Sequence, residues 1–156
     1  MRGYLETYGV AVEIHRVTLH VGPATFRPIA TATVEAHVLA PERAAIPEMT
    51  VRAVNAARAE GRRVIAVGTT VTRTLESAAT PDGRVAPLAG AASAYIDPGH
   101  RFRVVDALLT NFQLPRSSLL VLVCAFAGRE LVMKAYTHAL GAGYRFYSYG
   151  DAMLIV

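Results

Sequence analysis

The chain has 156 residues, of which 53% are hydrophobic, and its formal net charge is +4. This length predicts one domain that can bury a hydrophobic core. The single cysteine, Cys124, excludes an internal disulfide and a zinc site built from cysteines. The longest apolar run, Leu119–Ala127, is shorter than the roughly 20 residues that span a bilayer, and Met1–Glu6 shows no signal-peptide pattern. We therefore expect a cytoplasmic protein without a membrane segment.

The positive charge would suit an anionic partner such as RNA. The arginines are scattered, however, and cluster only at Arg62-Arg63 and at Arg101 and Arg103. Charge alone therefore gives only weak support for nucleic-acid binding.

The first part of the chain begins with a predicted strand and then a helix. β-Branched residues with partial alternation predict one long strand over Val10–Val21, which Gly22-Pro23 ends. The segment Thr31–Glu42 fits either a strand or an irregular connection. Pro47-Glu48 predicts the start of a helix, because proline fits the first turn and an acid there suits the helix dipole. Gly61 predicts the end of this helix.

A short buried strand is predicted next, over Arg62–Gly68. The turn Gly68-Thr69-Thr70 leads directly into a helix over Val71–Ala79. Turns follow at Thr80–Arg84 and Asp97–Gly99. This order of strands and helices predicts an α/β fold.

The last third contains two predicted helices between predicted strands. The expected elements are a strand over Arg101–Leu109, helices over Leu119–Ala127 and Arg129–Leu140, and closing strands over Tyr144–Tyr149 and Ala152–Val156. Ser117-Ser118 is a good N-cap pair for the first of these helices.

The turn Gly68-Thr69-Thr70 is the first place where chemistry is expected. Unpaired N–H groups and the helix dipole attract a carboxylate or phosphate at such a turn, although a threonine there also serves as an ordinary N-cap. Arg73 and Glu76, three residues apart, share a helix face. They would form either an exposed ion pair or a pair directed into a pocket above the strand ends.

The polar stretch Thr110–Ser118, between two apolar segments, is the second such place. Its amides, arginine and serines would bind a ligand that has both acceptors and anionic groups. Capping of the adjacent elements is the alternative for Asn111 and the serines, but it does not explain Gln113 or Arg116. We expect this loop and the Gly68 turn to converge on one cavity. The five histidines show no metal-ligand spacing.

Several motifs, in chain order, resemble one family: the S-adenosylmethionine:tRNA ribosyltransferase-isomerases of queuosine biosynthesis. The matching segments are Val17–Gly22 with Thr25-Phe26, Gly68-Thr69-Thr70 with Arg73 and Glu76, Pro98-Gly99 with Val104–Asp106, Asn111–Ser117, and Arg145–Ile155. The resemblance covers nearly the whole chain and corresponds to the C-terminal half of the family's enzymes. It implies that residues 1–156 form a single α/β domain with a mixed β-sheet flanked by helices, without the family's β-barrel domain.

The resemblance also implies a reaction. The family transfers the ribosyl group of S-adenosylmethionine to a 7-aminomethyl-7-deazaguanine in tRNA and isomerises it, while adenine and methionine leave. S-Adenosylmethionine is thus a substrate, and no metal is expected. The expected partners are tRNA and a second polypeptide or second copy that completes the site. The alternative is a divergent or truncated relative that binds S-adenosylmethionine or a nucleoside but has other chemistry or no catalysis.

Site residues follow from the same resemblance. The sulfonium acidifies the neighbouring C5′ protons, so the reaction needs a base and a proton for the departing adenine. The expected catalytic residues are His37, Glu42 and Arg73. The expected substrate-binding residues are His20, Gly22, Thr25, Phe26, Gly68, Thr69, Thr70, Glu76, Asn111, Phe112, Gln113, Arg116 and Ser117.

Three departures from the family pattern concern acid–base chemistry. The family usually has histidine at the position of Gln113 and near Ala40, and a Trp-Thr-Asp segment where this chain has Ala91-Ala92-Ser93. Glutamine forms hydrogen bonds but cannot exchange a proton near neutral pH. Together, these departures would remove several candidate acid–base groups of the family.

Overall fold

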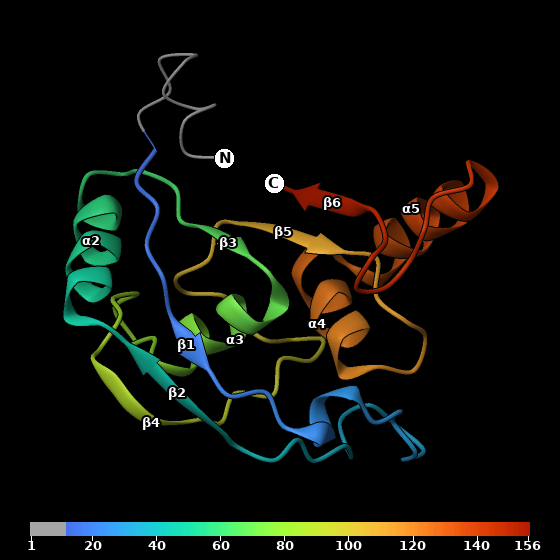
Figure 1. The fold of residues 1–156 in the computed structure, drawn as a ribbon, viewed down its shortest axis with the longest axis horizontal. Coiled ribbons are helices and arrows are strands. Elements are labelled where there is room, and N and C mark those ends of the chain that lie inside the picture. The colour runs from blue at the N-terminus through green and yellow to red at the C-terminus, as the bar shows by residue number, and fades with distance from the viewer. Residues whose placement is uncertain (1–11) are drawn as a thin grey trace.

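The computed structural model describes residues 12–156 and has the predicted α/β character (Figure 1). In chain order, the elements are β1 (Thr18–Leu19), the 3-10 helix η1 (Pro23–Phe26), β2 (Glu42–Ile46), α2 (Glu48–Ala59), β3 (Ile65–Val67), α3 (Thr69–Ser77), β4 (Leu88–Ala92), β5 (Ala107–Asn111), α4 (Ser118–Ala127), α5 (Arg129–Gly141) and β6 (Ala152–Ile155). The strands form two three-stranded sheets rather than one. None of the helices in residues 12–156 has the length and apolar content of a membrane span.

The first sheet is antiparallel, with the strand order β1-β2-β4. Its central strand, β2, alternates in burial: Glu42, Ala44 and Ile46 are buried, and the residues between them are exposed. This alternation is typical of a strand with one face on the core. It also turns the carboxylate of Glu42 inward.

The second sheet has the order β3-β5-β6 and is mixed. β3 and β5 are parallel, with Val67 opposite Leu109, and β6 is antiparallel to β5. Because β3 and β5 run in the same direction, the Gly68 turn and the residues after Asn111 leave the sheet at the same edge. The Gly68 N–H donates to the Leu109 carbonyl over 2.8 Å, which fixes the two strand ends together.

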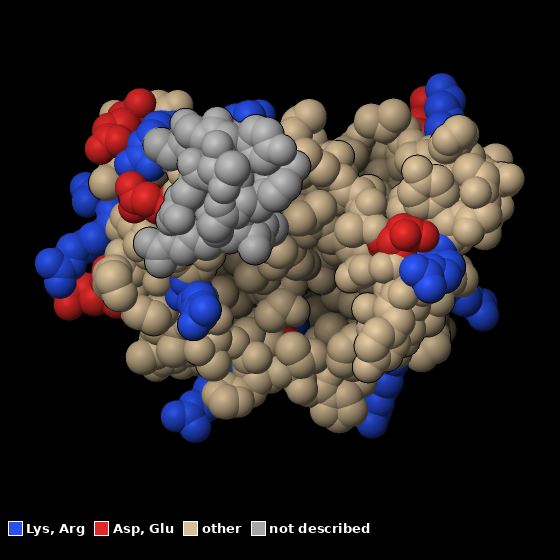
Figure 2. All heavy atoms as spheres, turned by 45° about the horizontal axis from the view of Figure 1, so that its top comes forward, with Lys and Arg blue, Asp and Glu red and all other residues tan. Residues whose placement is uncertain are grey.

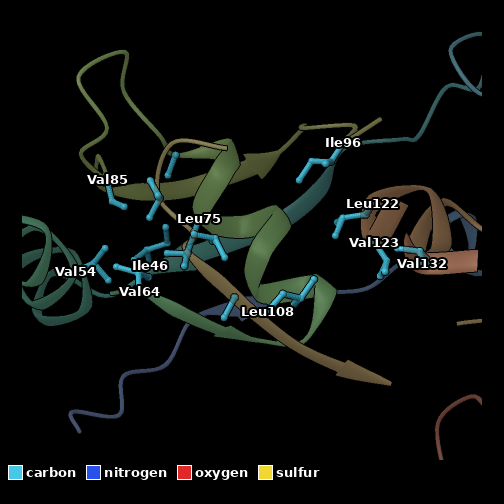
Figure 3. Packing of buried hydrophobic residues seen from close by; sticks show 14 of the residues in the cluster. Ile46, Val54, Val64, Leu75, Val85, Ile96, Leu108, Leu122, Val123 and Val132 are labelled. Atoms are coloured by element: carbon cyan, nitrogen blue, oxygen red, sulfur yellow. The ribbon is translucent and has the colours of Figure 1, made fainter. Parts of the chain in front are cut away.

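Helix α3 contacts strands of both sheets and occupies the centre of the molecule (Figure 1). Thr72 and Thr74 are completely buried on it, and their hydroxyls donate to the carbonyls of Gly68 and Thr70. A buried hydroxyl needs such a partner, and here the helix itself provides it. Leu75 of α3 and Leu108 of β5 belong to the same apolar core (Figure 3).

One prediction for the first half of the chain is wrong, and one open alternative is decided in favour of an irregular connection. The long strand over Val10–Val21 is ordered as strand only at Thr18–Leu19; residues 10 and 11 lie outside the described residues. The segment has β-branched residues, but only Thr18 and Leu19 pair with a neighbouring strand, and of these only Thr18 is β-branched. The segment Thr31–Glu42 is irregular up to residue 41, and β2 begins at Glu42.

Strand β4 was not predicted, because Leu88–Ala92 consists of residues with low strand propensity. Its strand character comes from pairing with β2. The strand predicted over Arg101–Leu109 begins only at Ala107 and extends to Asn111. Before it, Arg103, Val104 and Val105 donate their N–H groups to a side chain, as described below, and Asp106 donates to the Val64 carbonyl.

The strand predicted over Tyr144–Tyr149 is also wrong, because this segment closes into a compact turn. The N–H of Asp151 donates to the Arg145 carbonyl, and the Asp151 carboxylate accepts from the Arg145 N–H, each over 2.7 Å. Tyr147 has a positive φ of 72°. Helices α2, α4 and α5 and strand β6 lie where they were predicted, within two residues, and β3 lies inside its predicted range but begins three residues later. Helix α3 begins two residues earlier than predicted.

Leu108 and Leu154 lie on adjacent strands but differ in burial, which gives a matched test of the core. Leu108 is fully buried, whereas Leu154 is 59% exposed. We expect Leu108→Ala to lower the free energy of unfolding by about 2–5 kcal/mol, because it leaves a cavity. Leu154→Ala should change it by less than about 0.5 kcal/mol. Urea unfolding followed by circular dichroism measures both, and equal losses would contradict this packing.

Candidate functional site

A buried ion pair joins the two sheets through α3. The Nη1 of Arg73 lies 2.5 Å from Oε2 of Glu42, and each side chain is only 6% exposed. Glu42 comes from β2 and Arg73 from the middle of α3. A buried charge is tolerated only when it is paired and hydrogen-bonded, and both conditions hold here.

The remaining donors of Arg73 bind backbone carbonyls from two further segments. Its Nε donates to Ala94 over 3.0 Å, and its Nη2 donates to Ala40 over 3.1 Å and to Ala92 over 3.3 Å. The fork of the guanidinium suits such simultaneous contacts. Arg73 therefore fixes the segment before β2 and the end of β4 against α3.

The second oxygen of Glu42 holds the η1 segment. Its Oε1 accepts from the Gly22 N–H over 2.6 Å and from the Thr25 hydroxyl over 2.7 Å. Together with the ion pair, these bonds give each carboxylate oxygen of Glu42 at least one hydrogen-bond donor. The expected site residues Gly22, Thr25, Glu42 and Arg73 are thus brought together by direct contacts.

Glu76 has a different role from Arg73, which lies on the same face of α3. Its carboxylate accepts three backbone N–H bonds of 3.0 Å, from Arg103, Val104 and Val105. The Nε2 of His100 lies 3.6 Å from it. Of the two alternatives for Arg73 and Glu76, neither describes the structure: both are buried, but they bind different partners. Glu76 orders the segment that leads into β5.

The Gly68 turn begins α3 as predicted. Gly68 has a φ of 98°, which is easily adopted only by glycine, and no side chain caps this end of the helix. The carbonyl of Gly68 accepts from the N–H groups of Val71 and Thr72. The helix N-terminus therefore presents the N–H groups of Thr69 and Thr70, which is the arrangement that attracts an anion.

A small cavity lies between this turn, the ion pair and helix α4. Its volume is about 20 Å³. Its polar lining residues are Thr25, Glu42, Thr69, Thr70, Arg73, Tyr95 and Ser118, and Leu19, Leu39, Ala94, Ile96, Leu119 and Leu122 complete it. A cavity of this size holds about one water molecule. A nucleoside would enter only if the surrounding segments moved apart.

The loop after β5 reaches this cavity through its last residue. Ser118 lines the cavity and its hydroxyl donates to the Thr25 carbonyl over 3.4 Å. Ser117 caps α4 by accepting from the Leu120 N–H over 3.1 Å. Arg116 is exposed, with a φ of 58°, and its carbonyl accepts from the Ile29 N–H. The expected convergence of loop and turn is thus observed only at Ser118, and the cavity that they share is too small for the nucleoside that was expected there.

The amides at the start of the loop face away from the cavity. The Gln113 Nε2 donates to the Thr110 hydroxyl and the Asn111 carbonyl, over 3.0 and 3.2 Å. The Gln113 N–H donates to the Tyr136 hydroxyl, and burial raises the pKa of that tyrosine to about 12. Asn111 donates to the carbonyls of Gly150 and Asp151.

Phe112 lies in an aromatic cluster on the same side as Gln113. Its ring centroid is 5.3 Å from that of Tyr136 and 5.1 Å from that of Phe146. Phe112 is 5% exposed. Its contacts in this conformation are those of a core residue.

His37 has a buried nitrogen, Nε2, with no hydrogen-bond partner in the described part of the chain. Its ring packs against Tyr95, with the centroids 5.6 Å apart, and the Tyr95 hydroxyl donates to the Val34 carbonyl. Burial raises the pKa of Tyr95, so its phenol keeps its proton. An unpaired buried nitrogen is costly in a folded protein and points to a missing donor or acceptor.

His20 and Phe26 are exposed and line no described cavity. Tyr95 was not singled out from the sequence, and its only signal was an aromatic residue within an alanine-rich stretch. Burial raises the pKa of the Cys124 thiol, which agrees with a structural role. Within residues 12–156, no three His, Cys, Asp or Glu side chains lie close enough to hold a metal ion.

Comparison with known proteins gives a consistent result. The family model described as queuosine biosynthesis protein matches residues 4–155. The S-adenosylmethionine:tRNA ribosyltransferase-isomerase of Nitrobacter winogradskyi is 54% identical over 147 residues, which is 94% of this chain and 41% of that protein. The enzyme of the same name from Methylobacterium radiotolerans is 56% identical over 90% of this chain and 40% of its own length.

A solved structure agrees with these sequence relatives. The crystal structure of S-adenosylmethionine tRNA ribosyltransferase from Thermotoga maritima has a TM-score of 0.68 and 49% identity, covering 74% of this chain and 41% of that chain. The chain thus spans about two fifths of the length of these relatives.

The buried pair predicts a large effect of Arg73→Met on stability. This change leaves Glu42 charged and unpaired, so we expect the free energy of unfolding to fall by about 3–5 kcal/mol. Arg52→Met is the control, because Arg52 and Glu48 form a pair of 2.8 Å whose side chains are 74% and 73% exposed. Arg52→Met should lower the free energy of unfolding by less than about 1 kcal/mol. Similar losses in the two variants, measured by urea unfolding, would contradict a structural role for the buried pair.

Proposed function

We propose a function from one premise: the chain belongs to the queuosine biosynthesis protein family. Residues 1–156 would form the C-terminal α/β portion of an S-adenosylmethionine:tRNA ribosyltransferase-isomerase. The reaction would transfer and isomerise the ribosyl group of S-adenosylmethionine onto a 7-aminomethyl-7-deazaguanine in tRNA.

The observation that carries this proposal is the identity of 54–56% over at least nine tenths of the chain to proteins with that name. The match spans only about two fifths of those proteins, so the proposed activity would require further polypeptide. tRNA would be the macromolecular substrate, and the net charge of +4 suits it. The expected location is the cytoplasm, where tRNA is modified.

The turn at the start of α3 would bind the anionic end of S-adenosylmethionine. Thr69 and Thr70 present N–H groups and hydroxyls beside the cavity, and the helix dipole adds a favourable field for a carboxylate. Arg73 lies in the same lining, although most of its donors are already used within the protein.

His37 would act in proton transfer, either as the base for the C5′ proton of S-adenosylmethionine or as the acid for the departing adenine. Its Nε2 has no hydrogen-bond partner among residues 12–156, whereas both oxygens of Glu42 already accept bonds from Gly22, Thr25 and Arg73. Glu42 and Arg73 would then position the segments around the substrate. Gly22 and Thr25 would close over the substrate from one side, with Phe26 and His20 at the exposed rim.

The second candidate is a relative that binds S-adenosylmethionine or a nucleoside but lacks the family's chemistry. It is favoured by the hydrogen bonding of Gln113. Its side chain holds Thr110 and Asn111 and cannot exchange a proton near neutral pH. In this candidate, Asn111, Gln113, Arg116 and Ser117 keep the loop in shape, and Glu76 orders the chain before β5.

One assay tests both candidates, and a second assay separates them. Calorimetric titration of the chain with S-adenosylmethionine should show binding in both. Incubation with S-adenosylmethionine and precursor tRNA, in the presence of the rest of a family enzyme, should release adenine and give the modified wobble nucleoside by mass spectrometry if the first candidate holds. Adenine release without modified tRNA would favour the second, and no binding at all would contradict both.

His37→Gln tests the proposed proton transfer. We expect adenine release to fall by about 10²–10⁴-fold, because general acid–base catalysis contributes roughly that much. Binding of S-adenosylmethionine should change little, and His138→Gln on α5 is the control that should keep full activity. Unchanged turnover of the His37 variant would exclude His37 as the base or acid.

Gln113→His tests the second candidate. If the chain has diverged to other chemistry, restoring the family's histidine should not improve turnover of its own substrate. A large gain would show that the missing proton-exchanging group limits the family reaction, and it would contradict the second candidate.

A further inference from the structure

The turn between α5 and β6 displays tyrosine side chains to solvent. Tyr149 is 97% exposed and Tyr147 is 40% exposed. Phe146, beside them, is instead anchored inward, with its ring centroid 5.4 Å from that of the buried Tyr136. Tyr147, Tyr149 and the exposed Arg145 are called the tyrosine turn below. The roles proposed for the candidate site use none of these three side chains.

The backbone of the tyrosine turn is held in a strained conformation. Tyr147 has a φ of 72°, which a bulky side chain adopts only at a cost. The Tyr147 N–H donates to the Phe112 carbonyl over 2.9 Å, and the Asn111 amide donates to the Gly150 carbonyl over 3.4 Å. A Cβ at Gly150 would overlap the Arg145 carbonyl, so the turn requires glycine there. Burial of the tyrosines does not offset this strain, which indicates that their display serves binding.

The tyrosine turn lies at the edge of the sheet where the candidate site is found. Asn111 ends β5 and pairs with Ala152, the first residue of β6. The Gly68 turn leaves β3 at the same edge, because β3 and β5 are parallel. Figure 1 shows the connection between α5 and β6 beside the end of β5. A long ligand bound at the tyrosine turn would therefore lie along the same edge as the candidate site.

The charge of this part of the chain suits a polyanion. Basic residues outnumber acidic ones from residue 107 to the end, with Arg116, Arg129, Lys134 and Arg145 against Glu130 and Asp151. The Asp151 carboxylate already accepts the Arg145 N–H over 2.7 Å. Figure 2 shows the same excess of Lys and Arg over Asp and Glu on its right-hand side, where α4 and α5 lie in Figure 1.

Exposed aromatic rings on a basic surface are the arrangement that binds single-stranded nucleic acid. Unpaired bases stack on the rings, and cationic side chains contact the phosphates. A duplex already stacks its bases on one another, so it offers no free base face. A protein partner would also use tyrosines, but the excess of cations favours a phosphate backbone.

We propose that the tyrosine turn is a stacking platform for the unpaired bases of an RNA loop. Tyr147 and Tyr149 would contact base faces, and Arg145 would contact a phosphate. This inference rests on the proposed function, because the RNA would be the tRNA substrate and the bases those beside the modified nucleoside. The platform would hold the loop in register while the target base enters the candidate site.

A hairpin RNA with the unpaired loop of the precursor tRNA tests the platform. Fluorescence anisotropy measures its binding to the chain without S-adenosylmethionine. We expect Tyr149→Ala to weaken binding by about 5–100-fold, because loss of one base–aromatic stack has an effect of that size. Tyr149→Phe should keep the affinity, since stacking needs the ring and not the hydroxyl. Tyr147→Ala is a second variant that should also weaken binding.

Two further measurements separate stacking from general attraction to RNA. A fully paired duplex of the same sequence should bind wild type and Tyr149→Ala equally. The chain contains no tryptophan, so Tyr149→Trp adds a single fluorescent reporter at the platform. A stacked base quenches indole emission, and we expect quenching with the hairpin and none with the duplex.

Arg145→Gln tests the phosphate contact, and Arg52→Gln is its matched control. The two changes remove the same charge, and Arg52 lies on α2 with a side chain that is 74% exposed. Arg145→Gln should lower the slope of log affinity against log salt by about one, as expected for one lost phosphate contact. Equal slopes for the two variants would contradict that contact.

Three results would overturn the platform: no binding of the hairpin by the folded chain, equal affinity of wild type and both tyrosine-to-alanine variants, or self-association that Tyr149→Ala abolishes while RNA binding is unchanged. The last would assign the turn to a second copy. Thermal unfolding of each variant checks that the fold is kept.

The platform and the proposed function fail in different ways. Loop binding that depends on Tyr149, without any modified tRNA when the rest of a family enzyme is present, would keep the platform and defeat the function. Modification of tRNA by Tyr149→Ala at the wild-type rate and affinity would defeat the platform alone.

Discussion

The ion pair between Glu42 and Arg73 holds four segments of the chain together: the η1 region, the start of β2, the end of β4 and helix α3. Through Glu42 it binds the turn at Gly22 and the 3-10 helix at Thr25, and through Arg73 it binds the carbonyls of Ala40, Ala92 and Ala94. These segments have little regular structure of their own, so side-chain bonds replace a backbone ladder. The candidate cavity exists because this pair fixes its walls, and neither partner can be removed without leaving a buried charge.

The second constraint is the parallel pairing of β3 with β5. It brings the N-terminus of α3 and the start of the polar loop to one edge of the sheet, where ligands of α/β folds commonly bind. Glu76 supports this arrangement by accepting three N–H groups of the segment that precedes β5. Thus Arg73 and Glu76, neighbours on one helix face, position the two sides of the same site. The conformation described is closed, since its cavity holds about one water molecule.

Features of the fold that depend on local sequence were predicted, and features that depend on distant partners were not. Helices α2, α4 and α5 follow from proline, glycine and serine signals at their ends, and β3 follows from its short apolar run. Strand β4 is built from alanine and glycine and is a strand only because β2 pairs with it. The predicted strand at Tyr144–Tyr149 is a turn, because the N–H and the carboxylate of Asp151 bind the carbonyl and the N–H of Arg145.

In the site, sequence pattern identified Glu42 and Arg73 through a resemblance, but their pairing spans 31 residues and no local spacing reveals it. The same limit applies to Gln113, whose side chain turns toward Thr110 and away from the cavity.

The central claim is that the Gly68 turn, the Gly22–Thr25 segment and Ser118 enclose one binding site for S-adenosylmethionine. Amide chemical shifts of the isotope-labelled chain, recorded during titration with S-adenosylmethionine, test this most directly. The account predicts that the amides of Gly22, Thr25, Gly68, Thr69, Thr70 and Ser118 shift together with one saturation curve. Shifts confined to another surface, such as α5, or no shift in the folded chain at saturating ligand, would contradict it.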